Sequence, residues 1–348
     1  MSRAGLAALC CIVATCVRAQ TIHDRSYNEA LSELRAMLTG KTAMDLDRAV
    51  FVVENAYLDG SLDSSAFESR IAAMVALAKG WDRADPDRGY RKEDSVIFRA
   101  NRAVFAVMMD TTFIAPGVPA CLPMHYDPVD PFGSTDHTKG FVSKLMLTWT
   151  GNCHSLPLFY KMVCERMGGK AWLARAPMHL YLKQYSEQHG WYNTELTSGV
   201  FPMDAWLMAT GYVSADAIRS GIYMDTLSLA ATIALCVTDL AQGYQWLVPK
   251  GNEDFMLRCC ELALQYDPRS VPALLLKNDA LSKLVLSSKG ALRDAYYAEL
   301  NSNATRLVEL DYRAVPVEVY RKWMEELSQA EGKYRDLRLM KAEPVHGQ

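Results

Sequence analysis

The chain has 348 residues, enough for about two domains of average size. Half of its residues are hydrophobic and 22% are charged, which excludes a disordered chain, a collagen-like chain and a small disulfide scaffold. The 37 basic and 40 acidic residues give a formal net charge of -3 without long runs of one sign, so we expect a globular protein that does not bind nucleic acid.

The first twenty residues have the layout of a secretory signal peptide. Arg3 supplies a positive charge, residues 5–17 are apolar or small except Thr15, and Val17 and Ala19 are small residues before a cleavage site after Ala19. This apolar run is shorter than the roughly 20 residues that span a bilayer. We therefore expect residues 1–19 to be removed and the protein to be exported, to the periplasm or out of the cell. A buried N-terminal helix is the alternative. We expect no stable transmembrane segment elsewhere.

The region 20–112 has the apolar periodicity of helices. Apolar residues three and four positions apart predict helices over residues 26–38, 45–58, 67–78 and 95–109. Gly40, Gly60 and Gly80 follow the first three stretches and are expected to end those helices. Residues 81–93 are charged and contain Pro86 and Gly89, which predicts a loop.

The region 113–212 has a mixed pattern. Residues 111–140 contain five prolines and three glycines, which predicts a long structured loop that covers a cleft. Residues 145–167 are apolar and helix-like; within them residues 150–152 are turn-like, and the helix that starts at Ser155 reaches Gly168. Residues 171–176, 179–185 and 191–195 alternate as strands do, and the turn at 187–190 predicts a hairpin.

The region 213–348 is predicted to be helical from Ala215 onward. Residues 260–268 resemble the end of a tetratricopeptide helix, and residues 306–312 repeat the pattern 44 residues later. A plain helical bundle is the alternative. The adjacent Cys259 and Cys260 leave pairing or redox chemistry open, although neighbouring residues on a helix point apart.

Three side chains in the middle region fit a thiol nucleophile with its base. Cys153 would lie at the N-terminus of a helix, where the helix dipole and free N–H groups favour a thiolate. His179 would begin the second strand and serve as base and acid. Either Glu195 or Asn193, on the neighbouring strand, could orient the imidazole.

Two residues before the cysteine could also serve a cleft. Trp149 could form a wall or donate its indole N–H to an oxyanion, and a core role is its alternative. Asn152 could also contribute there, although a helix cap is the simpler expectation. His154 is expected to face solvent or to lie behind the site. The loop residues His125, Asp127, Asp130, Asp136 and His137 lack metal-ligand spacing, so we expect neither a metal nor a cofactor.

This arrangement resembles the transglutaminase-like superfamily of papain-related cysteine enzymes. The resemblance rests on Gly151-Asn152-Cys153 at a helix start, Gly168-Gly169 at its end, a strand over 172–175, His179 opening the next strand, and Trp191 followed by Glu195 and Thr197. A narrower likeness is to exported bacterial proteins that join this core to tetratricopeptide-like helices. The chain departs from the family pattern by having Glu195 where Asp is more common, and Leu180-Tyr181 after the histidine.

The resemblance implies an α+β fold with a papain-like core at 113–212, in which the helix bearing the cysteine packs on a small antiparallel sheet. Helical regions would flank it at 20–112 and, tetratricopeptide-like, at 213–348. Cys153 would be the nucleophile, His179 the general base and acid, and Glu195 the orienting group. The expected function is an exported cysteine hydrolase, a peptidase or amidase, or an acyltransferase, acting on a peptide or protein amide through a thioester. The alternative is a non-catalytic scaffold whose C-terminal helices bind a protein partner.

Overall fold

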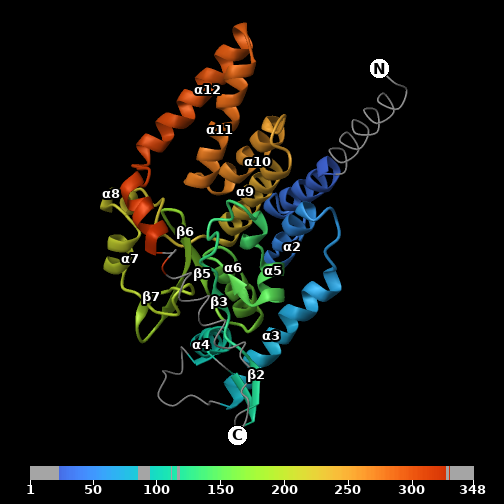
Figure 1. Cartoon of the computed structure of the whole chain (residues 1–348), viewed down its shortest axis with the longest axis vertical. Coiled ribbons are helices and arrows are strands. Elements are labelled where there is room, and N and C mark those ends of the chain that lie inside the picture. Colours follow the sequence, from blue (N-terminus) through green and yellow to red (C-terminus); the bar gives the residue numbers. More distant parts are fainter. Residues whose placement is uncertain (1–22, 85–94, 111, 116–117, 327–328, 330–348) are drawn as a thin grey trace, which may run out of the picture. The chain divides into compact units, whose positions relative to one another are not determined.

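A computed structural model describes residues 23–84, 95–110, 112–115, 118–326 and 329, so the predicted signal peptide lies outside the described residues. The fold is a mostly helical α+β structure with one three-stranded antiparallel sheet (Figure 1). The chain forms two compact units, each discontinuous in sequence. The division into three consecutive regions stays a prediction. In the described part of the chain, no helix has the length and apolar character needed to span a membrane.

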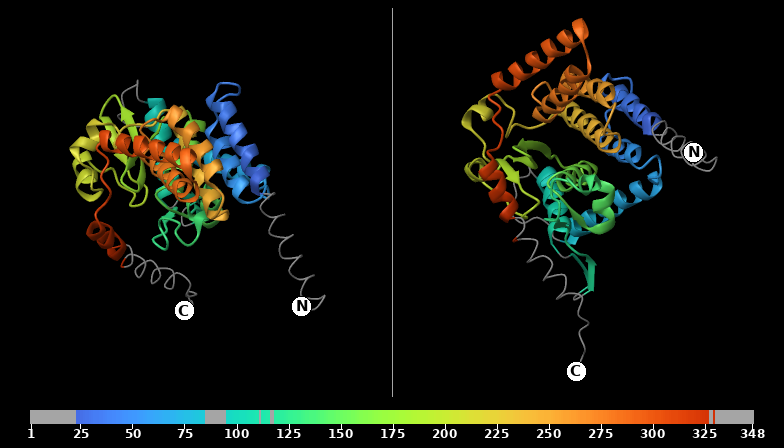
Figure 2. Two further views of the ribbon diagram at one scale, coloured as in Figure 1. Left: turned by 90° about the horizontal axis from the view of Figure 1, so that it is seen from above. Right: turned by 45° about the horizontal axis from the view of Figure 1, so that its top comes forward.

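The first unit contains the described residues up to Ser69, Arg219–Ile222 and Leu227–Tyr312. Its helices are one over residues 23–38, α2 (Leu46–Tyr57), the start of α3 (Ser64–Ala84), α9 (Leu229–Leu247), α10 (Glu253–Tyr266), α11 (Val271–Ser287) and α12 (Gly290–Glu309). Helices α9 to α12 follow one another through short connections, and each packs on the next (Figure 2). The rings of Tyr27, Tyr244 and Phe255 meet within this unit at 4.4–5.8 Å between centroids.

The second unit contains Arg70–Ile218, Tyr223–Thr226 and the chain from Arg313 onward. After α3 its elements are α4 (Ser95–Met109), β1 (Thr112–Ala115), β2 (Val118–Cys121), β3 (His125–Tyr126), η1 (His137–Gly140), α5 (Val142–Thr148), β4 (Thr150–Gly151), α6 (Ser155–Arg166), β5 (Trp172–Ala176), β6 (His179–Ser186), β7 (Gly190–Thr194), α7 (Asp204–Thr210) and α8 (Ala215–Arg219).

Three sequence predictions need correction. Helix α3 does not end at Gly80 but continues to Ala84, because Asp82 pairs with Arg99 at 2.9 Å and the Arg102 guanidinium lies over the Trp81 ring. The predicted loop at 111–140 contains the hairpin β1–β2, strand β3 and the short helix η1. Residues 145–167 belong to two helices, because Trp149 takes a left-handed conformation at φ 59° and ends α5.

The sheet has the order β5-β6-β7, and its strands lie close to the predicted ranges. A two-residue turn, Pro177-Met178, joins β5 to β6 and places Ala176 opposite His179. Because alternate residues of a strand share a face, His179 and Tyr181 point to one side, whereas Leu180 and Gln184 point to the other. Glu195 lies one residue beyond β7, where it forms an antiparallel bridge with Val200.

A buried chain of hydrogen bonds ties α6 to this sheet. The Tyr160 hydroxyl in α6 donates to the Asn101 carbonyl in α4 at 2.6 Å and accepts from Gln184 Nε2 in β6 at 3.0 Å. Gln184 Oε1 in turn accepts from the Thr194 hydroxyl in β7 at 2.7 Å. Gly169 is needed beside this chain, because a Cβ there would lie 2.5 Å from Asn101 Oδ1. Helix α6, which follows Cys153, is therefore held to β6, which begins at His179, and through β6 to β7, which ends just before Glu195.

We predict that Gln184→Leu lowers the free energy of unfolding by about 1–3 kcal/mol, because the buried hydroxyls of Tyr160 and Thr194 then each lose a partner. Urea denaturation followed by circular dichroism would measure the change. The control is Gln188→Leu at an exposed turn position, which should alter stability by no more than about 0.5 kcal/mol. Equal effects of the two substitutions would contradict the structural role of the chain.

Candidate active site

Cys153 lies in the turn that leads into α6. Asn152 Oδ1 accepts from the backbone N–H groups of His154 and Ser155 at 2.9 and 3.1 Å, and the Ser155 hydroxyl accepts from Asn152 N at 3.1 Å. This reciprocal cap fixes the start of the helix. Gly151 is required there, because a Cβ would lie 2.6 Å from Ser155 Oγ. The sulfur is thus held at the N-terminal end of α6, half-buried.

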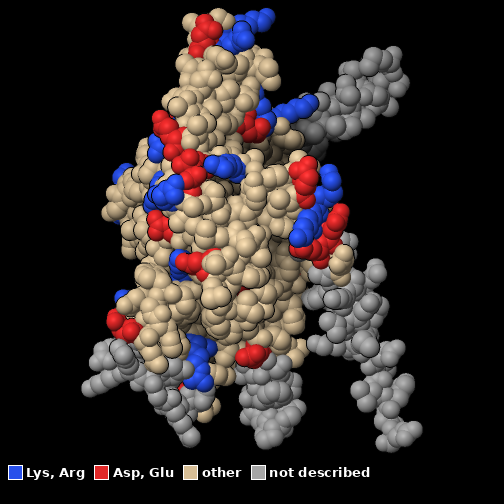
Figure 3. Space-filling view, turned by 90° about the vertical axis from the view of Figure 1, so that its left-hand side faces the viewer, with Lys and Arg blue, Asp and Glu red and all other residues tan. Residues whose placement is uncertain are grey.

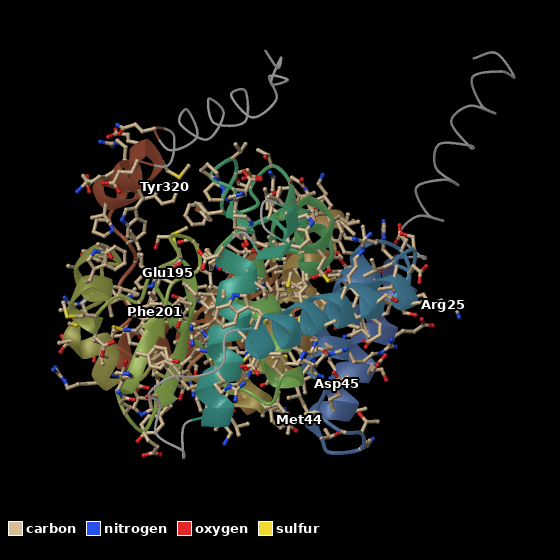
Figure 4. All side chains as sticks on the ribbon, turned by 90° about the horizontal axis from the view of Figure 1, so that it is seen from below. Arg25, Met44, Asp45, Glu195, Phe201 and Tyr320 are labelled. Atoms are coloured by element: carbon tan, nitrogen blue, oxygen red, sulfur yellow. The ribbon has the colours of Figure 1, made fainter. Side chains whose placement is uncertain are left out.

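His179, at the start of β6, and Glu195, just after the end of β7, come together at one end of the sheet. His179 Nε2 lies 2.5 Å from Glu195 Oε2. Glu195 is only 3% exposed, and its other oxygen accepts from the Thr197 N–H and hydroxyl at 2.9 and 2.7 Å. Figure 4 shows Glu195 from below. The carboxylate is therefore anchored on one side and holds the imidazole on the other.

The imidazole also interacts with the thiol. Hydrogen bonding between the Cys153 and His179 side chains shifts the pKa values of both, and because Nε2 faces Glu195, Nδ1 is the nitrogen left for the sulfur. Burial alone would raise the pKa of Cys153, but the hydrogen bond and positive charge of His179, with a smaller contribution from His154, lower it. The Met178 carbonyl oxygen lies 4.0 Å from the same sulfur.

The pKa of His179 moves in the opposite direction. Burial alone would lower it, but the hydrogen bonds to Cys153 and Glu195 and their negative charges raise it to about 10. The pKa of Glu195 is lowered, because the His179 charge and hydrogen bond and the Thr197 hydrogen bonds outweigh burial. These directions favour a thiolate–imidazolium pair beside a carboxylate. Such a pair supplies a nucleophile and a proton donor at neutral pH.

The remaining predicted site residues have other partners or untested roles. Asn193 Nδ2 donates to the Pro202 carbonyl and to Asp204 Oδ1, so Glu195 rather than Asn193 contacts the imidazole. Asn152 acts as the helix cap, and its Nδ2 donates to the Pro131 carbonyl at 3.1 Å, so its side chain is not directed to an oxyanion. The Trp149 side chain is half-buried, and its role in a cleft stays a prediction.

Tyr126 is a neighbour of the site that sequence reasoning missed. Strand β3 runs parallel to β4 and pairs Tyr126 with Gly151, two residues before the cysteine. Burial raises the pKa of Tyr126, and the charges of Cys153 and Glu195 raise it further, which places its phenol within electrostatic reach of both. A two-residue parallel pairing between a loop and a turn leaves no periodic signal in the sequence. Met178, described below, was missed as well.

The loop around η1 satisfies its acidic residues internally. Asp130 accepts hydrogen bonds from the backbone and side chains of Ser134 and Thr135 and from the backbone of Asp136, and these bonds lower its pKa against the effect of burial. Among the residues that the structure describes, no group of three or more His, Cys, Asp or Glu side chains could hold a metal ion.

Cys153 differs from the other thiols of the described chain. Cys164, Cys236, Cys259 and Cys260 are free and buried, and burial raises the pKa of each of them. A buried thiol with a raised pKa is inert, whereas a half-buried thiol with a lowered pKa is reactive. Only the position of Cys153 therefore suits nucleophilic chemistry among these five.

Comparisons with known proteins do not assign a family. No protein-family model matches the chain, and no curated protein matches it in sequence. A crystal structure of menin, which reveals the binding site for Mixed Lineage Leukemia (MLL) protein, is similar to it with a TM-score of 0.35 and 11% sequence identity, over 82% of this chain and 70% of that one. A likeness at this level carries no argument about fold or function.

We predict that His179→Asn slows alkylation of Cys153 by iodoacetamide at pH 7 by at least about tenfold, because burial then raises the pKa of the thiol and each pKa unit lowers the thiolate fraction tenfold. Mass spectrometry of the Cys153 peptide across pH 5–10 would give both profiles. Cys153→Ala supplies the background, and the denatured chain supplies the rate of an ordinary thiol. Superimposable profiles for the parent chain and His179→Asn would contradict the thiolate–imidazolium pair.

Proposed function

We propose that the protein is an exported cysteine hydrolase, a peptidase or amidase, with a transglutaminase-like, papain-related core. The observation that carries the proposal is the continuous array from Cys153 through His179 to Glu195, in which the thiol pKa is lowered and the imidazole pKa is raised. The cysteine at a helix start and the histidine at a strand start, next to an antiparallel strand, support the same family. Export rests on the signal-peptide pattern of residues 1–19.

In this mechanism the Cys153 thiolate attacks the carbonyl carbon of an amide and forms a tetrahedral intermediate. The N-terminal end of α6, including the Cys153 N–H, faces the developing oxyanion. The His179 imidazolium gives its proton to the leaving amine, the C–N bond breaks, and a thioester remains. His179 then takes a proton from water, which attacks the thioester and releases the acid.

Glu195 keeps the imidazole in the orientation that this cycle needs. Its Oε2 accepts from Nε2, which directs Nδ1 toward the sulfur, and its burial strengthens the electrostatic interaction with the imidazolium. If an amine replaces water as the second nucleophile, the same steps give transamidation. Substrates of this chemistry are peptide or protein amides.

We predict that Cys153→Ala abolishes hydrolysis of a fluorogenic peptide library and labelling by a thiol-reactive amide probe. Glu195→Ala should lower kcat/KM by about 10²–10⁴-fold, because the imidazole loses its orienting group. Asn193→Ala, whose side chain binds the 202–204 segment instead, is the matched control and should cost much less. Steady-state kinetics on the purified full chain would separate the two.

Labelling that persists in the Cys153→Ala variant would contradict the proposal, as would equal losses in Glu195→Ala and Asn193→Ala. The second of these outcomes would point to folding rather than to orientation of the ring, so thermal unfolding of both variants belongs in the same experiment.

A binding function is the second candidate, and one observation favours it. A groove of ≈ 610 Å³ lies between α10, α11 and α12, and its lining is mostly polar and charged. The Lys277–Glu299 ion pair, at 2.7 Å, and Asn303, which donates to the Leu274 carbonyl, hold α11 and α12 together beside it. A protein whose function resides there would keep its full function in Cys153→Ala, which separates the two candidates directly.

A further inference from the structure

Two exposed apolar residues adjoin residues of the site: Met178 precedes His179 in the chain, and Val200 pairs with Glu195. Met178 immediately precedes His179 and is 49% exposed, while its own carbonyl oxygen lies 4.0 Å from Cys153 Sγ. Val200 is 43% exposed and exchanges both backbone hydrogen bonds with Glu195, at 2.9 and 3.0 Å. Residues directly opposite in an antiparallel pair have side chains on the same face, so Val200 lies beside the carboxylate that holds the ring.

The backbone at Met178 gives a second, independent reason to single it out. Its φ is 56°, in the left-handed region that Gly and Asn adopt readily and that strains the backbone of a residue such as Met. It is the second residue of the turn Pro177-Met178, a position at which Gly or Asn would relieve the strain. A strained, exposed methionine beside a reactive sulfur points to a role for its side chain in binding.

The apolar character continues away from the site. Phe201 and Met203, which follow Val200, are exposed, as is Trp206 in α7. Figure 4 shows Phe201 near Glu195, as expected because Phe201 directly follows Val200, which pairs with Glu195. Figure 3 shows the side that carries α7 in Figure 1, on which uncharged residues cover wide areas between scattered Lys, Arg, Asp and Glu side chains. Exposed apolar residues therefore continue along the chain from Val200 to Trp206, with the exposed Asp204 among them.

We propose that Met178 and Val200 form a subsite for a bulky apolar side chain on the amine side of the scissile amide. This inference rests on the proposed hydrolase function. The proton for the leaving amine comes from His179, so the amine must lie next to the imidazole, and the residue that carries it must lie against the side chains that flank the ring. Met178, next to His179 in the chain, and Val200, paired with Glu195, are the exposed apolar residues placed to do so. The substrates are then peptides with a large apolar residue directly after the cleaved bond.

The same subsite receives the amine in the reverse step. When an amino acid amide attacks the Cys153 thioester, its nitrogen forms the new C–N bond, the C–S bond breaks and leaves the thiolate, and His179 accepts the proton of the amine. Phenylalaninamide and leucinamide would fill the subsite, whereas glycinamide has no side chain to place there. The apolar amides should therefore capture the acyl group about tenfold or more efficiently than glycinamide.

Acetyl transfer from p-nitrophenyl acetate tests this without knowledge of the natural acyl group. Release of p-nitrophenolate reports acylation, and chromatography gives the ratio of acetylated amide to acetate. Both products arise from one acyl-enzyme, so the ratio does not depend on the rate of acylation. We expect Met178→Asn, which keeps a residue suited to positive φ, and Val200→Asn to reduce the preference for phenylalaninamide over glycinamide at least about fivefold. Leu286→Ser, at an 87% exposed position of α11, is the control and should keep the parent ratio.

The outcomes separate the inference from the function on which it rests. If p-nitrophenolate release depends on Cys153 but the two amides capture the acetyl group equally, the subsite does not exist and the hydrolase proposal stands. An unchanged preference in both Asn variants, each folded by circular dichroism, would likewise overturn the assignment of these two residues. If release is the same in Cys153→Ala as in the parent chain, the hydrolase proposal itself fails.

Discussion

The buried carboxylate of Glu195 is the constraint on which the site depends. A carboxylate that is 3% exposed needs a positive partner or several hydrogen bonds, because an unpaired buried charge costs several kcal/mol. Thr197 supplies two hydrogen bonds, and His179 supplies the charge. Cys153 and Glu195 together raise the pKa of His179, and the hydrogen bond and positive charge of His179 in turn lower the pKa of the Cys153 thiol, against burial and the Glu195 charge.

Such an electrostatic arrangement works only if its three members keep their distances, and the polar network behind the sheet provides this. Tyr160 and Gln184 join α6 to β6, and Thr194 joins β6 to β7. Gln184 and Thr194 point to the face of the sheet opposite to His179, and Tyr160 reaches Gln184 from α6. The hydrogen bonds of Gln184 thus lie away from the face on which the imidazole meets Glu195. The rigid frame and the reactive groups occupy different faces of the same strands.

The sequence predicted the parts of this arrangement that depend on local chemistry. The turn before Cys153, the helix after it, the three strands and the hairpin leave periodic or turn signals, and they lie close to where those signals place them. What it missed depends on contacts between distant segments. Helix α3 continues past Gly80 because Arg99 and Arg102 of the next helix hold its last turn, and β3 reaches the site by pairing with β4. The choice between Glu195 and Asn193 also required coordinates, since strand alternation places both on one face and the register between β6 and β7, which pairs Asn193 with Lys183, leaves Glu195 nearer to the ring.

The left-handed conformation of Met178 shows how local preference and site geometry can disagree. A glycine would fit the turn between β5 and β6 better, and a longer turn would remove the strain but would move His179 away from the end of the strand. The tight turn fixes the histidine opposite Ala176 and brings its own carbonyl to within 4.0 Å of the sulfur. The methionine side chain is left 49% exposed. A residue type that destabilises its own turn, next to the histidine of the site, is accounted for by the proposed subsite rather than by the fold.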